Sequence, residues 1–226
     1  MTTAIIGTGG IGSAIARLLA SGGEALRLSS ADPTSARTLA AQIGPAAVVA
    51  AGNREVLDGA EAVVLALRFT VLKSVIDEIA GPVAGKVVIV PSNPLSTDAH
   101  GNISRLLPEG QSSGEVVAGW LPAEARLAMA FGSMSAGLLE SASNRKPEPA
   151  VLFYALGDDG AGDDGAGDDA AGDDVAGEVV GRLIRTAGFE PVKIGGIGQS
   201  GRLEVGGDLH DLVVGPAAAR SLIGGA

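Results

Sequence analysis

The sequence has no cysteine among its 226 residues, which excludes disulfides, thiolate metal sites and cysteine nucleophiles. It has only two histidines, His100 and His210, so we expect no histidine-rich metal site. One Trp, one Tyr and four Phe provide few surfaces on which bases could stack, and the net charge of −10 disfavours contact with a phosphate backbone. We therefore expect no nucleic-acid partner.

Long apolar runs and a basic N-terminal leader are also missing. No apolar stretch reaches the length that spans a bilayer. The apolar N-terminal run is interrupted by glycines and follows no basic residue, unlike a signal peptide. We expect a cytoplasmic protein that makes no membrane contact.

The acidity of the chain is concentrated in one repeat. From Gly157 the sequence reads GDDGA, GDDGA, GDDAA, GDDVA, and its eight aspartates account for eight of the ten net negative charges. Asp, Gly and Ala alone cannot form a packed core, so we expect a solvated loop over 157–174. The alternative is a calcium site, because paired carboxylates are suitable oxygen ligands, although the spacing matches no EF-hand loop.

The N-terminal part alternates between short apolar runs and amphipathic segments, which predicts a parallel sheet covered by helices. We expect an α/β fold, namely a Rossmann doubly wound parallel sheet with a small C-terminal extension. Residues 1–91 form the dinucleotide-binding core, and residues 92–226 complete the sheet and the substrate pocket. The predicted strands are Thr3–Ile6, Ala25–Leu28, Ala47–Ala51, Ala62–Leu67, Lys86–Val90, Leu127–Phe131, Val151–Leu156 and Pro191–Ile194. The predicted helices are Ile11–Leu19, Pro33–Ile43, Val71–Ile79, Gly114–Leu121 and Val175–Ala187, with a weak turn over Arg54–Leu57 and an irregular tail from Gly195.

A glycine-rich turn follows the first predicted strand and opens the first predicted helix. Such a G-x-G-x-x-G string is weak evidence alone, but this context is the one that dinucleotide binding requires. Gly7 permits the tight turn, Gly9 lets the backbone approach a pyrophosphate, and Gly12 allows the helix to pack on the strand. The helix N-terminus then attracts the pyrophosphate. The predicted cofactor-binding residues of the turn are Gly7, Thr8, Gly9, Gly10, Ile11 and Gly12.

The end of the second strand bears on the choice between NAD and NADP. An acidic residue there would bind the ribose hydroxyls of NAD and repel a 2′-phosphate. This chain has Ser29 and Ser30 instead, which favours NADP. Asp32 follows slightly later and either caps the next helix or reaches the ribose. Arg37 either reaches back to a phosphate or is a solvated side chain.

Residues at the ends of the next strands complete the expected cofactor site, which comprises Leu67, Arg68 and Asn93 besides the turn and the serines. Arg68 either holds an anionic substrate or cofactor phosphate, or is a solvated loop residue. Asn93 either bonds the nicotinamide ribose or substrate, or stabilises an Asn-Pro turn. The segment Gln111–Ser113 either caps a helix or lines the pocket. His210 is either a substrate contact or a surface residue, and Trp120 and Met134 are expected to pack in the core or at a subunit interface.

Several of these segments together resemble the NADPH-dependent reductases of the deazaflavin coenzyme F420, especially their bacterial dinucleotide-binding relatives. The resemblance covers nearly the whole chain, and the GDD repeat is its main interruption. It is carried by the glycine turn, Ala62–Leu67, GKVVIVPSNPL (Gly85–Leu95), LPEGQSSGEV (Leu107–Val116), Ala130–Gly132, Leu152–Tyr154, GFEPV (Gly188–Val192) and Gly207–His210.

The resemblance implies direct hydride exchange between nicotinamide C4 and deazaflavin C5, with orientation and a dry pocket as the protein's contribution. It names no general base, and we identify no catalytic side chain. Arg68-Phe69 stands where the family has a proline and an aromatic residue beside the nicotinamide, and Ser29-Ser30 stands where it has the serine-arginine pair that binds the 2′-phosphate. Gly132 lies in the segment where the archaeal enzymes carry a histidine.

The sequence thus predicts an oxidoreductase that uses NADP and passes hydride to coenzyme F420 or another small acceptor. We expect it to act as a homodimer. Two alternatives are a reductase of an imine or ketone metabolite, and a non-catalytic NAD(P)-binding redox sensor. Fold alone does not separate these classes.

Overall fold

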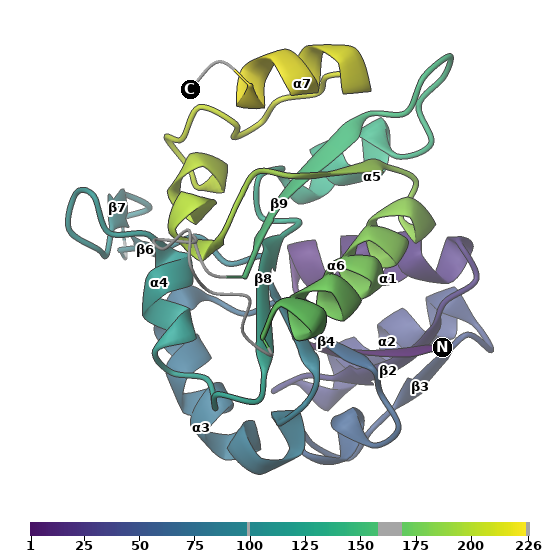
Figure 1. Cartoon of the computed structure of the whole chain (residues 1–226). Helices are drawn as coiled ribbons and strands as arrows, with labels where there is room; N and C mark the ends of the chain where they lie inside the picture. Colours follow the sequence, from purple (N-terminus) through teal and green to yellow (C-terminus); the bar gives the residue numbers. More distant parts are fainter. Residues whose placement is uncertain (99, 158–168, 225–226) are drawn as a thin grey trace.

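The computed structural model describes residues 1–98, 100–157 and 169–224. Eight strands form one sheet in the order β10-β9-β8-β5-β4-β1-β2-β3, and helices cover both of its faces (Figure 1). The expected Rossmann-type α/β fold is confirmed. The strands are β1 Thr2–Ile6, β2 Ala25–Ser29, β3 Ala47–Val49, β4 Ala62–Leu65, β5 Val87–Val90, β8 Arg126–Ala130, β9 Val151–Leu156 and β10 Glu190–Lys193.

Strand order reverses beside β1, which pairs in parallel with β2 on one side and β4 on the other. In open parallel sheets the crevice at such a reversal binds the ligand. The sheet is parallel from β3 to β8. It becomes antiparallel between β8 and β9, and β10 then runs parallel to β9.

The two faces of the sheet bury separate apolar layers because neighbouring residues of a strand point to opposite sides. In β1, Ile5 packs in one layer and Ala4 and Ile6 in the other. The first layer lies under α1 Gly10–Ser21, α2 Pro33–Ile43, α5 Ala136–Ala142 and α6 Asp169–Thr186. The second lies under α3 Phe69–Val83, α4 Ser113–Ala118, α7 Pro216–Ile223 and the 3₁₀ segments η1 Glu55–Leu57 and η2 Ile197–Leu203.

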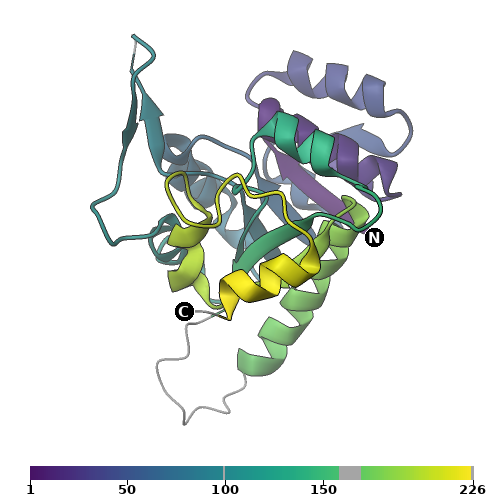
Figure 2. The ribbon, with the colours of Figure 1, turned by 90° about the horizontal axis from the view of Figure 1, so that it is seen from above.

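A separate hairpin stands away from the sheet. Its strands, β6 Leu95–Thr97 and β7 Ile103–Arg105, pair only with each other in an antiparallel ribbon. Figures 1 and 2 both show this ribbon projecting from the body of the molecule. Runs of three residues show little periodicity, so the sequence pattern did not predict this hairpin.

The part after residue 91 supplies β8, β9 and β10 to the main sheet. It departs from expectation in two ways. The tail from Gly195 is not irregular throughout, since it contains η2 and α7. Helix α7 begins at Pro216, whose missing N–H costs nothing in the first turn. The helix α5 was missed as well.

The GDD repeat is the clearest correction. Helix α6 begins at Asp169 and not near Val175, so the loop expected over 157–174 is wrong for residues 169–174. Alanine is a strong helix former, and residues 170 and 171 are alanines. The rest of the repeat, residues 158–168, lies outside the described residues, and so does most of the candidate calcium site.

A buried ionic network ties the C-terminal part to the Rossmann core at the amino ends of the parallel strands. Glu24 is only 5% exposed. It accepts hydrogen bonds from Thr3 Oγ1 at 2.8 Å and from Arg182 Nη1 at 2.7 Å. The second guanidinium arm of Arg182, which belongs to α6, donates to Glu61 at 2.7 Å. Arg182 therefore neutralises the buried carboxylate of Glu24, whose other side-chain partner is the uncharged hydroxyl of Thr3.

We predict that Arg182→Ala lowers the free energy of unfolding by about 2–3 kcal/mol, because removal of one partner leaves a buried charge unpaired. Arg17→Ala is the matched control. It removes the Arg17–Glu140 pair, which is exposed, and should cost less than about 1 kcal/mol. Urea unfolding measures both, and equal losses would contradict the assigned role of Arg182.

Candidate functional site

The glycine turn occupies the crevice beside β1, where it meets the end of β4. Gly7 has a φ of +100°, and a Cβ on it would lie 2.3 Å from the carbonyl oxygen of Ala66. A Cβ on Gly12 would lie 2.0 Å from the carbonyl oxygen of Gly7. Both positions therefore require glycine for packing alone. Gly9 differs, because nothing lies within 4 Å of the place where its Cβ would be.

The space beside Gly9 belongs to a cleft of about 540 Å³ at the carboxyl edge of the sheet. Helices α1 and α3 both begin at this cleft, and neither helix has an acidic residue in its first turn. Free N–H groups and the positive helix ends favour an anionic ligand there. The cleft is lined by Gly9, Gly10, Ile11, Ala66, Leu67, Arg68, Phe69, Thr70, Pro91, Ser92, Asn93, Leu95, Ser96 and Thr97.

The cleft brings together six of the expected cofactor residues: Gly9, Gly10, Ile11, Leu67, Arg68 and Asn93. Gly7, Thr8, Gly12, Ser29 and Ser30 are not in its lining. Thr8 is buried, and its hydroxyl bonds that of Ser35 on α2, so it fastens the turn to a neighbouring helix. A dinucleotide also needs a second region, toward β2, for its adenosine half.

At the end of β2 the two serines differ. Ser29 is buried, and its hydroxyl donates to Asn53 Oδ1 at 2.8 Å. Ser30 is half-buried and has no side-chain bond among the described residues. Asp32 is the N-cap of α2, where its carboxylate accepts from the Thr34 amide at 2.9 Å. The capping role expected for Asp32 is confirmed. Arg37 is exposed.

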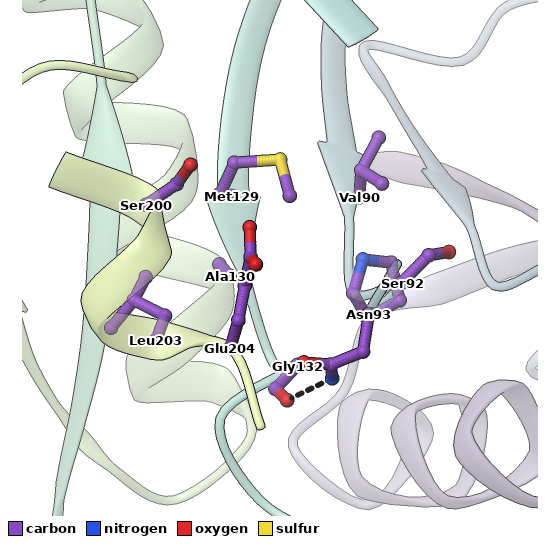
Figure 3. A pocket seen from close by; sticks show the side chains of 10 residues that line it. Val90, Ser92, Asn93, Met129, Ala130, Gly132, Ser200, Leu203 and Glu204 are labelled. Atoms are coloured by element: carbon purple, nitrogen blue, oxygen red, sulfur yellow. Dashed lines mark hydrogen bonds between the residues drawn. The ribbon is translucent and has the colours of Figure 1, made fainter. Parts of the chain in front are cut away.

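Asn93 has both ends of its amide engaged, as Figure 3 shows in part. Its Nδ2 donates to the Gly132 carbonyl at 2.9 Å, and its Oδ1 accepts from the Val205 amide at 2.7 Å. The side chain thus joins the ends of β5 and β8 to a segment more than 100 residues later. Asn93 lines the cleft and stabilises its wall, and its carbonyl also accepts from the Leu95 amide at 2.8 Å across the Asn-Pro segment.

Ser92 and Gly132 bring the neighbouring strand ends close together. The Ser92 hydroxyl donates to the carbonyl oxygen of Leu67, which links the ends of β5 and β4. A Cβ on Gly132 would lie 2.5 Å from the Pro91 carbonyl oxygen. This backbone contact leaves no room for a side chain at Gly132, so the histidine of the archaeal enzymes has no equivalent at that residue.

Arg68 is exposed at the cleft, and its side chain makes no hydrogen bond or ion pair within the described residues. No Asp, Glu, His, Lys or Tyr of the described chain is in the lining, so Arg68 supplies its one charged group. The lining can therefore bind an anion and donate hydroxyl hydrogen bonds. It offers no described side chain that would exchange a proton near neutral pH.

Residues 92–226 were expected to complete the substrate pocket, but the sequence did not single out Ser200, Leu203 or Glu204. A small cavity adjoins the cleft, sharing Pro91, Ser92 and Asn93, and is closed on its other side by Ser200, Leu203 and Glu204 (Figure 3). Glu204 is 3% exposed. Its place in a glycine-rich tail gave no signal of burial. His210 lines neither the cleft nor the small cavity, and its Nδ1 lies 3.4 Å from Oδ2 of Asp211.

Two expected local features are confirmed near this cavity. Ser112 is the N-cap of α4 in a full capping box, and hydrogen bonds from its hydroxyl and amide lower the pKa of Glu115. Met134 is buried in the core, and Trp120 packs against Phe69 with the ring centroids 5.5 Å apart.

Among the described residues, no group of three or more acidic or histidine side chains could hold a metal ion. Similarly, no described helix combines the length and the apolar character needed to cross a membrane.

Comparison with solved structures shows the same fold in several proteins. A hypothetical protein from Sinorhizobium meliloti has 24% sequence identity and a TM-score of 0.76, with 95% of each chain covered. A protein from Arthrobacter sp., provisionally named an F420-dependent NADP reductase, has 23% identity and a TM-score of 0.67, with 88% of this chain and 86% of that chain covered. A reductive aminase from Aspergillus terreus, solved with NADPH and ethyl-5-oxohexanoate, has 17% identity and a TM-score of 0.57, with 88% and 56% covered. These identities establish the fold and no more.

No curated protein is significantly similar in sequence. A family profile, however, matches residues 2–94, from β1 through the end of β5 to Pro94. This is the part that contains the glycine turn and most of the cleft lining. Over residues 2–94 the chain is similar to the family described as NADP oxidoreductase coenzyme F420-dependent, which supports the resemblance expected from the sequence.

Proposed function

We propose that the protein is an NADP-dependent oxidoreductase that transfers a hydride between the nicotinamide C4 and a small acceptor bound in the same cleft. The observation that carries this proposal is the cleft itself, which begins at the glycine turn on the N-terminus of α1 and continues to β6. A volume of about 540 Å³ lies in the range of small-molecule sites.

The residues fit a nicotinamide dinucleotide. The open space beside Gly9 would receive the pyrophosphate against the first amides of α1. When bound, the nicotinamide supplies or accepts the hydride. The chain binds and orients both reactants, with Leu67, Arg68 and Asn93 at the ends of neighbouring strands as the proposed contacts.

NADP is favoured over NAD because serines, and no acidic residue, stand directly at the end of β2. Asp32 follows later and caps α2 through its Oδ1, whereas Ser30 presents a hydroxyl without a described partner. The reductive aminase and the Plasmodium falciparum pyrroline carboxylate reductase of the same fold were solved with NADPH or NADP. The Ser29 hydroxyl is already bonded to Asn53. We therefore infer that Ser29 holds the end of β2 in place and that its hydroxyl does not bind the cofactor directly.

The lining also bears on the acceptor. Hydride addition to a ketone produces an alkoxide, which needs a proton donor close by, and the described lining has no general acid. A deazaflavin can delocalise the added charge over its ring system, and an iminium ion becomes neutral on accepting hydride. The cleft therefore favours coenzyme F420 as acceptor, with an iminium substrate as the second candidate.

Gly9→Ala tests the cofactor site. We predict that it weakens NADPH binding at least about tenfold, because the new methyl group occupies space that only a ligand would fill, while the free energy of unfolding changes by less than about 0.5 kcal/mol. Gly12→Ala is the contrasting control and should cost about 1–3 kcal/mol of stability, since its methyl group overlaps the Gly7 carbonyl. Unchanged NADPH affinity in the folded Gly9→Ala protein would contradict the assigned site.

Turnover tests the reaction. We expect NADPH oxidation, followed at its nicotinamide absorbance, with coenzyme F420 or a cyclic imine, and none with the matching ketones. NADPH should bind about tenfold more tightly than NADH, equivalent to about 1.4 kcal/mol. Binding without turnover across deazaflavin, imine and ketone acceptors would favour the redox sensor instead.

Arg68→Ala tests the proposed anion contact. We predict a loss of about tenfold in affinity for the anionic ligand that Arg68 holds, and a weaker salt dependence of that affinity. A rise in the dissociation constant of NADPH identifies a cofactor phosphate, whereas a rise in the acceptor KM alone identifies an anionic acceptor. Lys73→Ala removes a charge from the same helix outside the cleft lining, and should change neither.

A further inference from the structure

The hairpin of β6 and β7 forms one wall of the cleft but has little support of its own. Leu95, Ser96 and Thr97 of β6 line the cleft, whereas all three residues of β7 are exposed. Two-stranded ribbons are marginally stable in water even when longer than this one. Figures 1 and 2 show that the ribbon projects from the body, so its orientation must be set where it joins the rest of the chain.

The base of the hairpin is fastened to the segment that follows η2. Leu106 donates its amide to the Pro94 carbonyl at 2.8 Å, which closes the ribbon. Before β6, Asn93 accepts a hydrogen bond from the Val205 amide. At the end of β7, Arg105 Nη1 donates to Glu204 Oε2 at 2.7 Å, and Arg105 Nη2 donates to the Gln111 carbonyl at 2.7 Å.

Glu204 is a stiff anchor for this attachment. Its side chain is 4% exposed, against 35% for that of Arg105. The second carboxylate oxygen accepts from the Ser113 amide at 2.6 Å. A buried carboxylate is costly unless it is paired and hydrogen-bonded, so both partners hold it in one place. Figure 3 shows Glu204 beside the cavity that adjoins the cleft, close to Asn93.

We infer that Arg105 and Glu204 are positioning residues whose ion pair holds the β6–β7 hairpin as a wall of the cleft and thereby sets how the acceptor is placed against the nicotinamide. The inference rests on the proposed function. The glycine turn joins β1 to α1, and the hairpin pairs with neither element. Loss of the pair should therefore affect the acceptor and leave NADPH binding almost unchanged.

The test compares Arg105→Gln, Glu204→Gln and the control Arg202→Gln in the full-length protein. Arg202 pairs with Asp208 in the same C-terminal segment, but neither residue lines the cleft, and the Arg202 side chain bonds only Asp208 and the Leu222 carbonyl among the described residues. Arg105→Gln should raise the acceptor KM or lower kcat so that kcat/KM falls about tenfold, as a small displacement of a reactant can produce. The dissociation constant of NADPH should stay within about twofold. Glu204→Gln keeps the shape of the side chain and should have the same effect in weaker form, and Arg202→Gln should leave both quantities unchanged.

Hydrogen–deuterium exchange of residues 95–106 provides a readout that does not depend on turnover. Loss of the Arg105–Glu204 ion pair should make the amides of residues 95–106 exchange faster in Arg105→Gln and Glu204→Gln than in the parent protein or Arg202→Gln. Unchanged exchange, or faster exchange with an unchanged kcat/KM, would overturn the inference. A fall in NADPH affinity that parallels kcat/KM would also overturn it, because that result indicates general loosening. If no acceptor is turned over, the proposed function fails, while the exchange data still decide whether the pair fixes the hairpin.

Discussion

The close contact between the first turn and the end of β4 is the constraint on which the site depends. Gly7 and Gly12 leave no room for a Cβ, since the nearest backbone oxygens would be 2.3 and 2.0 Å away. This contact brings the N-terminus of α1 down against β1 and beside Ala66. Where the contact ends, at Gly9, space becomes available. The same backbone that excludes side chains at Gly7 and Gly12 therefore leaves open space for a ligand at Gly9.

A second set of contacts completes the site from the far end of the chain. Gly132 packs against the Pro91 backbone, and Asn93 spans from Gly132 to Val205. These contacts are made by backbone atoms and one amide side chain, so they hold the strand ends at fixed distances without placing a charge in the cleft. Arg182 performs the corresponding task at the opposite edge of the sheet, where it joins α6 to Glu24 and Glu61. The C-terminal part is thus attached to the Rossmann core at both edges.

Much of this architecture could be predicted from the sequence, because apolar runs and glycine spacing are local signals. The buried strands Ala62–Leu65 and Val87–Val90 and the glycine turn lie where the pattern placed them. The cap at Asp32 is equally local. The hairpin, by contrast, has strands of three residues and depends on Glu204, about 100 residues away. Neither its short strands nor the burial of a glutamate in a glycine-rich tail leaves a periodic trace, so sequence reasoning could not find them.

The candidate residues divide according to whether their bonding capacity is already used. Ser29 and Asn93 were expected to contact the cofactor, yet the hydroxyl of one and the amide of the other are bonded within the protein. Arg68 and the amides at the start of α1 have no described partner, and both face the cleft. Polar groups without a partner at the edge of a sheet are the ones whose hydrogen bonds remain for a ligand. Recognition of the dinucleotide is therefore assigned chiefly to backbone amides and one arginine. The bonded side chains hold those groups in place, and Asn93 keeps one Nδ2 hydrogen for the proposed contact.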